Sequence, residues 1–216
     1  AQSYVGASFE QPIASGEHTG MAVTRVLESI RLTDPQIKFY QASSSELFGN
    51  SNLLSQNEQT PFQPRSPYAI AKLFGYWTTK LYRDGYGMFA TNGILFNHES
   101  PLRGLEFVTR KISNDVAKIK LGLSKKINLG NLDGARDWGY APEYVEGMWK
   151  LLQQKNSGDY VLSTDETHTV REFAELAFSY VDLKWDKYVK VDKKLYRLLE
   201  VNSLKGDSSK TRKKIG

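Results

Sequence analysis

Apolar residues in the first half of the chain follow two different spacings. Between residues 15 and 31 they recur near the 3.6-residue period of an amphipathic helix. Over residues 37–42 and 89–96 they instead form short, nearly continuous runs, which are typical of strands buried on both faces of a sheet. The pattern therefore predicts one helix followed by two buried strands.

Capping and turn residues mark a second helix between these two strands. Ser66 is a residue type favoured at a helix N-cap, and Pro67 is favoured at the first helical position. Gly85 and Gly87 belong to a residue type that ends helices. The sequence therefore predicts a helix over 67–84, preceded by a long polar surface connection over 50–65.

The second half of the chain continues the alternation after a charged loop. The predicted elements are a helix over 107–121, a strand over 127–129, a helix over 142–153, a strand over 159–163 and a helix over 170–181. Helices that alternate with buried strands indicate an α/β protein with a doubly wound, parallel, Rossmann-like sheet. We expect a first, partial Rossmann-like domain over 1–106. Residues 107–216 are expected to form mainly a small α/β lobe, with elements that return to the first domain.

Composition indicates which class of protein this is, but it says little about the reaction or ligand. Apolar residues make up 40% and charged residues 25% of the 216 positions, which are ordinary globular values. No apolar run approaches the ~18 residues needed to cross a bilayer, and no secretory leader is visible. The chain has no cysteine and its three histidines lie far apart, so we expect neither disulfides nor a metal site. We expect a cytoplasmic protein that acts without a membrane.

Much of the formal net charge of +5 lies near the end of the chain, in Lys205, Lys210, Arg212, Lys213 and Lys214. Excess positive charge attracts anionic partners such as phosphates. A run of this kind is more often a solvated helix face. We therefore expect no nucleic-acid partner.

A hydroxyl, a carboxylate, a phenol and an ammonium follow the first predicted strand. Ser44 and Glu46 come where that strand reaches its carboxyl end, the edge at which open α/β sheets bind ligands. Tyr68 and Lys72 lie one helical turn apart on the same face of the next helix. Because a nearby ammonium favours the phenolate, we expect Lys72 to lower the pKa of Tyr68 and make it a general base.

The Tyr-x-x-x-Lys spacing occurs twice more in the chain. Tyr76 precedes Lys80, and Tyr180 precedes Lys184. Eight residues along a helix rotate Tyr76 by about 80° from Tyr68 and move it about 12 Å along the axis, so the two phenols cannot share a site. We expect the two extra tyrosines to be ordinary core or surface residues.

Five segments have a distinctive composition: ASSSELFG, PRSPYAIAK, NGILFNHESP, FVTRKI and LGNLDGARDWGYAPEYV. Together they resemble the GDP-mannose 4,6-dehydratase family, a group of extended short-chain dehydrogenases/reductases, and the resemblance runs from Ala1 to Gly216. It implies a lyase of nucleotide-sugar metabolism that dehydrates GDP-mannose to GDP-4-keto-6-deoxymannose, on the route to GDP-fucose. It also implies NADP as a returning hydride carrier and a homo-oligomer, dimer or tetramer.

The resemblance implies a role for each group of the site. Tyr68 would take the proton of the mannose 4-hydroxyl, Ser44 would bind that hydroxyl, and Lys72 would hold Tyr68 ionised. Glu46 would remove the C5 proton and protonate the oxygen that leaves C6. The implied cofactor-binding residues are Ala1, Gln2, Ser3, Lys72, His98 and Arg103. The implied substrate-binding residues are Asn97, Thr109, Arg110, Lys111, Arg136, Arg197 and Glu200.

The sequence departs from the family pattern at several positions. Ser44 stands where the family usually has threonine, Ala14 where it has a cofactor-contacting tyrosine, and Leu198 where it has proline. A related dTDP-glucose dehydratase has Asp-Glu where this chain has Ser45-Glu46, and an epimerase does not need the base at Glu46. The single carboxylate therefore favours the GDP-mannose enzyme.

A further departure concerns the start of the chain. The family has a Gly-x-x-Gly-x-x-Gly turn before the segment that Ala1 matches. Backbone amides at such a turn hold the cofactor pyrophosphate, so we expect this chain alone to bind NADP poorly. The alternative to an enzyme is a catalytically incompetent fragment or pseudoenzyme that acts as a nucleotide-sugar-binding or subunit-interaction module.

Overall fold

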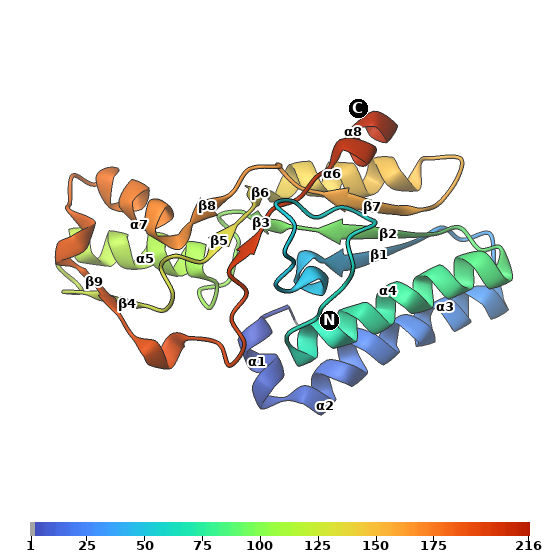
Figure 1. Cartoon of the computed structure of the whole chain (residues 1–216), viewed down its shortest axis with the longest axis horizontal. Coiled ribbons are helices and arrows are strands. Elements are labelled where there is room, and N and C mark those ends of the chain that lie inside the picture. Colours follow the sequence, from blue (N-terminus) through green and yellow to red (C-terminus); the bar gives the residue numbers. More distant parts are fainter. Residues whose placement is uncertain (1–2) are drawn as a thin grey trace.

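A parallel three-stranded sheet forms the centre of the protein, whose computed structural model describes residues 3–216 (Figure 1). Its strands are β1 (Phe39–Ser44), β2 (Ala90–Leu95) and β7 (Asp159–Leu162), in the order β1-β2-β7. The middle strand, β2, is buried along its whole length. The predicted parallel sheet is confirmed, with strand boundaries that differ by one or two residues from those expected.

Helices cover both faces of this sheet (Figure 1). α3 (Ala22–Thr33) and α4 (Pro67–Tyr86) lie side by side on one face, and α6 (Ala141–Leu152) lies on the other, next to α8 (Ser209–Ile215). This double covering confirms the predicted α/β fold class.

Alternation along β2 explains why both faces are apolar. Successive strand side chains point to opposite faces. Ile94 accordingly packs in a cluster with Tyr76 of α4, whereas Leu95 packs in a cluster with Leu151 of α6. Apolar residues at consecutive positions of one strand therefore join helices on opposite sides of the sheet.

The predicted start of α4 is confirmed at the atomic level. Ser66 is the N-cap, and its Oγ accepts a hydrogen bond from the Ala69 N–H at 3.0 Å, while Pro67 occupies the first helical position. The helix runs past Gly85 and ends at Gly87, which has a left-handed φ of 67°. Glycine adopts that conformation at little cost, so the end lies two residues later than the sequence indicated.

The first predicted helix is longer and less regular than expected. It consists of α2 (Pro12–Ser15), a π-helical turn over Gly16–Met21, and α3. A further short helix, α1 (Val5–Glu10), precedes it and was not predicted. No helix within residues 3–216 is long and apolar enough to cross a membrane.

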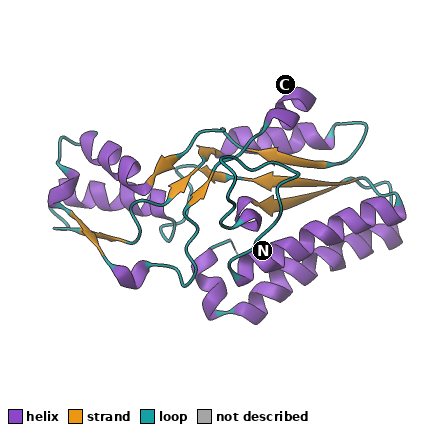
Figure 2. Ribbon diagram, viewed as in Figure 1, coloured by secondary structure: helices purple, strands orange, loops and turns teal. Residues whose placement is uncertain are grey.

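A second lobe lies beyond the carboxyl ends of the central strands (Figure 2). It contains α5 (Val108–Lys120), α7 (Val170–Ser179) and the parallel pair β4 (Ile127–Leu129) and β9 (Val189–Val191). Buried apolar side chains from α5, β4 and α7 form one cluster at its centre. The helices and the β4 strand match the predicted elements, while the division of the chain at residue 106 stays a prediction.

Very short strands connect the two lobes. β3 (Asn97–Glu99) pairs in parallel with β6 (Trp138–Tyr140). A second small sheet has the order β10-β5-β8, formed by β10 (Ser203–Leu204), β5 (Ala135–Arg136) and β8 (His168–Thr169). These strands were not predicted, because their two or three residues contain no apolar run like those of β1 and β2.

Asp137 holds these connecting strands together. Its fully buried carboxylate accepts hydrogen bonds from the N–H and the hydroxyl of Thr164, from the Asp165 N–H and from the Gly206 N–H. Three segments that are distant in the sequence therefore meet at one side chain.

The last part of the chain returns to the loop that follows β1. Gln56 forms a parallel bridge with Gly206. The Asn50 side chain donates to the Glu200 carbonyl at 3.1 Å and accepts from the Asn202 N–H at 2.9 Å. The predicted connection over 50–65 is thereby fixed by residues about 150 positions further along.

Candidate active site

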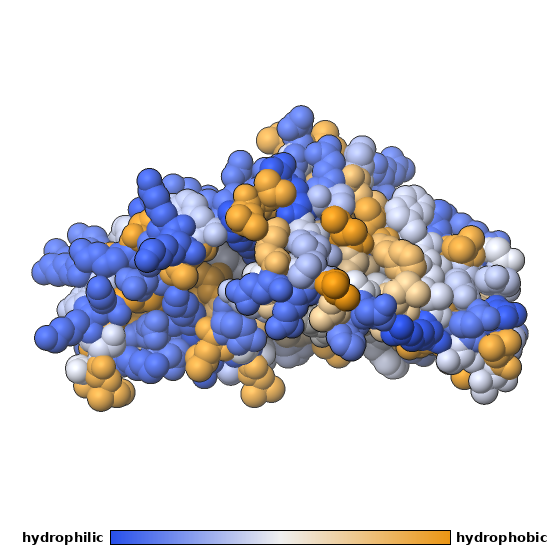
Figure 3. Space-filling model, turned by 90° about the horizontal axis from the view of Figure 1, so that it is seen from below, coloured by the Kyte–Doolittle hydropathy of each residue, from blue (hydrophilic) through white to orange (hydrophobic). Residues whose placement is uncertain are grey.

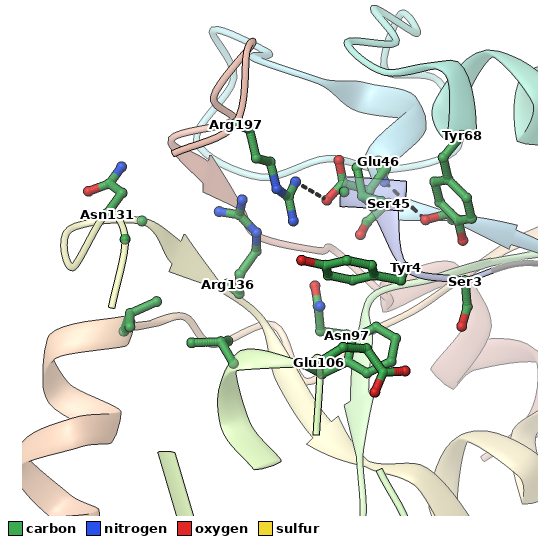
Figure 4. A pocket seen from close by; sticks show the side chains of 18 of the residues that line it. Ser3, Tyr4, Ser45, Glu46, Tyr68, Asn97, Glu106, Asn131, Arg136 and Arg197 are labelled. Atoms are coloured by element: carbon green, nitrogen blue, oxygen red, sulfur yellow. Dashed lines mark hydrogen bonds and ion pairs between the residues drawn. The ribbon is translucent and has the colours of Figure 1, made fainter. Parts of the chain in front are cut away.

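A cleft of about 710 Å³ opens at the carboxyl ends of β1 and β2, between the central sheet and the second lobe (Figure 4). Residues from β1, α4, β3, the loop before α5 and the loop 193–200 line it. Parallel sheets collect polar groups at this edge, because the strands all end there and the chain turns into loops.

Ser44 and Glu46 reach the cleft from the end of β1. Ser44 is the last residue of the strand, and its Oγ accepts a hydrogen bond from the Glu46 N–H at 3.3 Å. It thereby caps a single helical turn over Ser45–Phe48. This turn begins directly after the strand and places the mostly buried Glu46 carboxylate at the wall of the cleft.

Tyr68 and Lys72 lie in the first two turns of α4, and both are buried. The Lys72 ammonium donates a hydrogen bond to the Ala42 carbonyl of β1 at 2.7 Å. Its nitrogen lies 5.7 Å from the centre of the Tyr68 ring. Since an ammonium carries three donors and this bond uses one, Lys72 can also bind a ligand in the cleft.

The pKa values of this pair differ from the sequence prediction. Burial raises the pKa of Tyr68 to about 12, and a hydrogen bond with Ser44 opposes the rise. Burial also lowers the pKa of Lys72 to about 8. The expected lowering of the Tyr68 pKa by Lys72 is therefore wrong in this structure. Desolvation of the phenolate is the largest cause, and the cation whose charge lowers this pKa is Arg103, not Lys72, whose ammonium is bonded to Ala42.

The two other Tyr-x-x-x-Lys pairs lie away from the cleft, as predicted. Tyr76 lies on the buried face of α4, with its ring centre 4.9 Å from that of Phe62. Tyr180 is 82% exposed on the second lobe. Position relative to the sheet edge, and not the spacing itself, therefore distinguishes Tyr68.

An arginine from the far end of the chain contacts Glu46. Arg197 Nη1 lies 3.0 Å from Glu46 Oε1 in a hydrogen-bonded ion pair. The Arg197 N–H donates to Glu200 Oε1 at 2.7 Å, which helps to hold the loop. Arg136 lies beside Arg197 (Figure 4), and burial lowers the pKa of its guanidinium. The cleft thus brings a carboxylate and two arginines together.

β3 and the loop after it bring further predicted residues to the cleft. His98 Nδ1 lies 2.9 Å from the Phe96 carbonyl oxygen, and its ring stacks on Tyr144 with 5.0 Å between ring centres. Arg103 Nε lies 3.2 Å from Glu99 Oε2. Both predicted cofactor residues are therefore held by neighbouring groups.

Most of the predicted site residues meet at this one cleft. Those that line it are Ser3, Ser44, Glu46, Tyr68, Lys72, Asn97, His98, Arg103, Lys111, Arg136, Arg197 and Glu200. Thr109 and Arg110 lie on α5 and do not belong to the lining. Ala1 and Gln2, which were predicted to contact the cofactor, lie outside the described residues.

Sequence reasoning missed several polar residues of the lining, among them Glu99, Asn131 and Lys194. Glu99 and Asn131 lie within segments that carried the family resemblance, so a signal was available for both. Lys194 lies in a loop without any pattern. Among the described residues, no group of three or more histidine, aspartate or glutamate side chains could hold a metal ion.

A sequence profile of the GDP-mannose 4,6 dehydratase family matches residues 1–216. GDP-mannose 4,6 dehydratase 1 of Arabidopsis thaliana is 50% identical over 220 residues, covering 100% of this chain and 61% of the plant protein. The human GDP-mannose 4,6 dehydratase is 45% identical over 234 residues, covering 100% of this chain and 63% of the human protein. The chain spans about three fifths of the length of these relatives.

Solved structures of the same fold are more distant in sequence. RMD from Pseudomonas aeruginosa, complexed with NADPH, has a TM-score of 0.90 at 20% identity, covering 100% of this chain and 72% of that chain. DesIV, a dTDP-glucose 4,6-dehydratase from Streptomyces venezuelae with NAD bound, has a TM-score of 0.87 at 19% identity, covering 100% and 65%. At these identities the likeness establishes the fold.

The match of the family profile to the whole chain agrees with the resemblance seen in the five sequence segments. The match to a relative of 50% identity covers the whole chain, and therefore also the segments that line the cleft. This chain therefore belongs to the GDP-mannose 4,6 dehydratase family.

Proposed function

We propose that this chain carries the catalytic residues of a GDP-mannose 4,6-dehydratase, which converts GDP-mannose to GDP-4-keto-6-deoxymannose. One arrangement supports the proposal: Ser44, Glu46, Tyr68 and Lys72 all line a cleft that also contains arginines suited to a diphosphate. A phenol, a carboxylate and an ammonium within one cleft can carry out each proton transfer that this reaction needs.

The reaction requires a hydride carrier, and the residues at the sheet edge fit a nicotinamide dinucleotide. Lys72 has unused donors next to the carboxyl end of β1, and the Arg103 guanidinium suits a phosphate group. We propose that Lys72 and Arg103 hold NADP together with Ser3 and His98. Ala1 and Gln2, which lie outside the described residues, are proposed to contribute as well. When bound, NADP supplies a hydride acceptor for C4 and a hydride donor for C6.

Tyr68 takes the proton of the mannose 4-hydroxyl in the first step. Burial keeps its phenol protonated, so ionisation requires a cation close to the phenol oxygen. Lys72 lies one helical turn away, and we propose that its ammonium supplies that cation in the loaded site, although it is bonded to the Ala42 carbonyl in this structure. Ser44, which is hydrogen-bonded to Tyr68, orients the hydroxyl that loses its proton.

Glu46 carries out the elimination of water. The C4 ketone acidifies the proton on C5, and the Glu46 carboxylate removes it. The electron pair of the C5–H bond forms a C5–C6 double bond, the C6–O bond breaks, and the departing oxygen takes a proton from the Glu46 carboxyl to leave as water. One side chain therefore serves first as general base and then as general acid.

The GDP part of the substrate occupies the second lobe's side of the cleft. Arg136 and Arg197 are placed to bind the diphosphate, since both are cleft-lining cations at neighbouring positions. Lys111 lines the cleft from α5, and its ammonium donates to the Asn128 carbonyl at 2.7 Å. The further proposed contacts are Asn97 and Glu200, which also line the cleft. Direct contacts of Thr109 and Arg110 with the substrate stay a sequence prediction, because neither side chain belongs to the lining.

The direct test incubates the full-length protein with GDP-mannose and NADP in deuterium oxide. We expect the 4-keto-6-deoxy product with deuterium at C5, and no net reduction of NADP, as followed by NMR and absorbance. Bound GDP-mannose without product or exchange at C5 would overturn the enzyme assignment and support the binding module instead.

We also propose a second copy of this chain as partner, because α4 carries an exposed apolar stripe. Ile70, Phe74, Trp77 and Leu81 are 59%, 45%, 52% and 62% exposed and recur at helical spacing along one face. The neighbouring α3 adds Val26. In the view from below, apolar side chains appear on the side where α3 and α4 lie (Figure 3). Two such helix pairs are self-complementary about a two-fold axis.

The charged substitution Trp77→Glu tests this surface. Burying a carboxylate at the centre of an apolar helix contact is expected to raise the dimer dissociation constant at least about 100-fold, as for an interface hot spot. Trp149→Glu is the matched control, because Trp149 is 61% exposed on α6, on the opposite face of the sheet. Sedimentation of the full-length protein measures both; equal masses for the two variants would exclude the α3–α4 face.

The expected cytoplasmic location and lack of a nucleic-acid partner stay predictions.

A further inference from the structure

One carboxylate oxygen joins three segments at the wall of the cleft. Glu99, the last residue of β3, accepts a hydrogen bond from the Thr109 hydroxyl at 2.6 Å through its Oε2. The same Oε2 lies 3.2 Å from Arg103 Nε, and the Glu99 side chain is only 18% exposed. A strand end, the loop that follows and the first turn of α5 therefore meet at one carboxylate oxygen, which accepts a hydrogen bond from Thr109 and forms an ion pair, without a hydrogen bond, with Arg103.

Arg103 is held from a second side by an aromatic ring. Its guanidinium carbon lies 3.4 Å from the centre of the Phe107 ring. The loop itself is folded into turns, because Arg103 N–H donates to the Ser100 carbonyl at 3.0 Å and Phe107 N–H donates to the Gly104 carbonyl at 3.1 Å. The Phe107 ring and the Glu99 carboxylate therefore both contact the guanidinium of Arg103, which lines the cleft.

Thr109 connects the same carboxylate to the second lobe. It is buried in the first turn of α5 and does not line the cleft, so its hydroxyl serves Glu99. Lys111, two residues later on this helix, does line the cleft. The position of the substrate side of the cleft therefore depends on the bond between Glu99 and Thr109.

We infer that Glu99 is a positioning residue that fixes Arg103 for the cofactor phosphate and the start of α5 for the nucleotide sugar. This inference rests on the proposed function. The two bonds differ in chemistry: the Arg103 contact needs a negative charge, whereas the Thr109 bond needs only an acceptor oxygen. Glutamine at position 99 therefore removes the first contact and can keep the second.

Titration of the full-length protein with NADPH and, separately, with GDP tests the inference. Loss of a charge-assisted contact is expected to weaken NADPH binding of Glu99→Gln about tenfold and to change GDP binding by less than about twofold. Thr109→Val should show the opposite pattern, with GDP binding weakened about fivefold and NADPH binding nearly unchanged. Glu175→Gln, an exposed carboxylate on α7, is the matched control and should bind both ligands as the unaltered protein does.

A double variant separates positioning from general destabilisation. If Glu99 acts through Arg103, Glu99→Gln with Arg103→Gln binds NADPH no more weakly than Arg103→Gln alone. Additive losses, or unchanged NADPH binding by Glu99→Gln, would overturn the inference. These titrations measure binding and require no turnover. A protein that binds NADPH but is inactive would refute the proposed dehydration, and the titrations would still test whether Glu99 positions Arg103.

Discussion

Glu46→Gln in the full-length protein is expected to lower the rate of product formation by at least about 10³-fold, the scale on which removal of a general acid–base group acts. An amide has the shape of the carboxyl group but cannot accept the C5 proton. GDP-mannose binding should stay the same or become tighter, because the Arg197 guanidinium loses its ion-pair partner and is available to the diphosphate.

NMR of product and of deuterium exchange at C5, together with a GDP-mannose titration, checks both parts of this result. Glu46→Asp is the matched variant: it keeps the charge on a shorter side chain and should retain measurable exchange. Unchanged turnover of Glu46→Gln would remove the base role. Loss of GDP-mannose binding would show that Glu46 mainly supports the fold of the cleft.

Tyr68→Phe is expected to abolish oxidation at C4 with a similar loss of at least about 10³-fold, because the phenol oxygen that takes the hydroxyl proton is gone. Tyr76→Phe provides the matched control on the same helix and in the same Tyr-x-x-x-Lys spacing, but in the core. It should change activity by less than about twofold, with any effect limited to stability. Equal losses for the two variants would contradict a role specific to Tyr68.

The pH dependence of kcat/KM tests the roles of Tyr68 and Lys72 together. The pKa of Tyr68 is raised to about 12 and that of Lys72 is lowered to about 8. The active form needs an ionised Tyr68 and a protonated Lys72, so the rate should rise about tenfold per pH unit below 8. Above 8 it should level off, because loss of the Lys72 proton offsets the gain in phenolate. In Lys72→Arg the rise should continue past 8.

The sequence predicts the layers of this fold well, because each long element has a readable period or cap. Ser66 and Pro67 locate the start of α4, and continuous apolar runs locate β1 and β2. The residues that carry the proposed chemistry can be predicted because Ser44 and Glu46 come at the end of β1, and Tyr68 and Lys72 lie at the start of α4. A site residue can be predicted from local sequence wherever its own helix or strand fixes its position.

Other parts of the site depend on contacts that no local pattern encodes. The ion pair of Glu46 with Arg197 joins residues 151 positions apart. The pKa of Tyr68 was predicted in the wrong direction, because burial is a property of the assembled fold, whereas the helical spacing to Lys72 is local. Thr109 was assigned to the substrate from its motif, and in the structure its hydroxyl serves Glu99.

The pairing of the chain's last part with the loop after β1 has a consequence for how the protein is made. Asn50 is held by the backbone at Glu200 and Asn202, and Gln56 by the backbone at Gly206. During synthesis the segment that carries Glu46 leaves the ribosome long before these partners exist. Contacts of such long sequence separation form late and slowly. A nascent chain therefore has its sheet and α4 before it has a finished cleft, and the emergence of residues 200–206 completes the site.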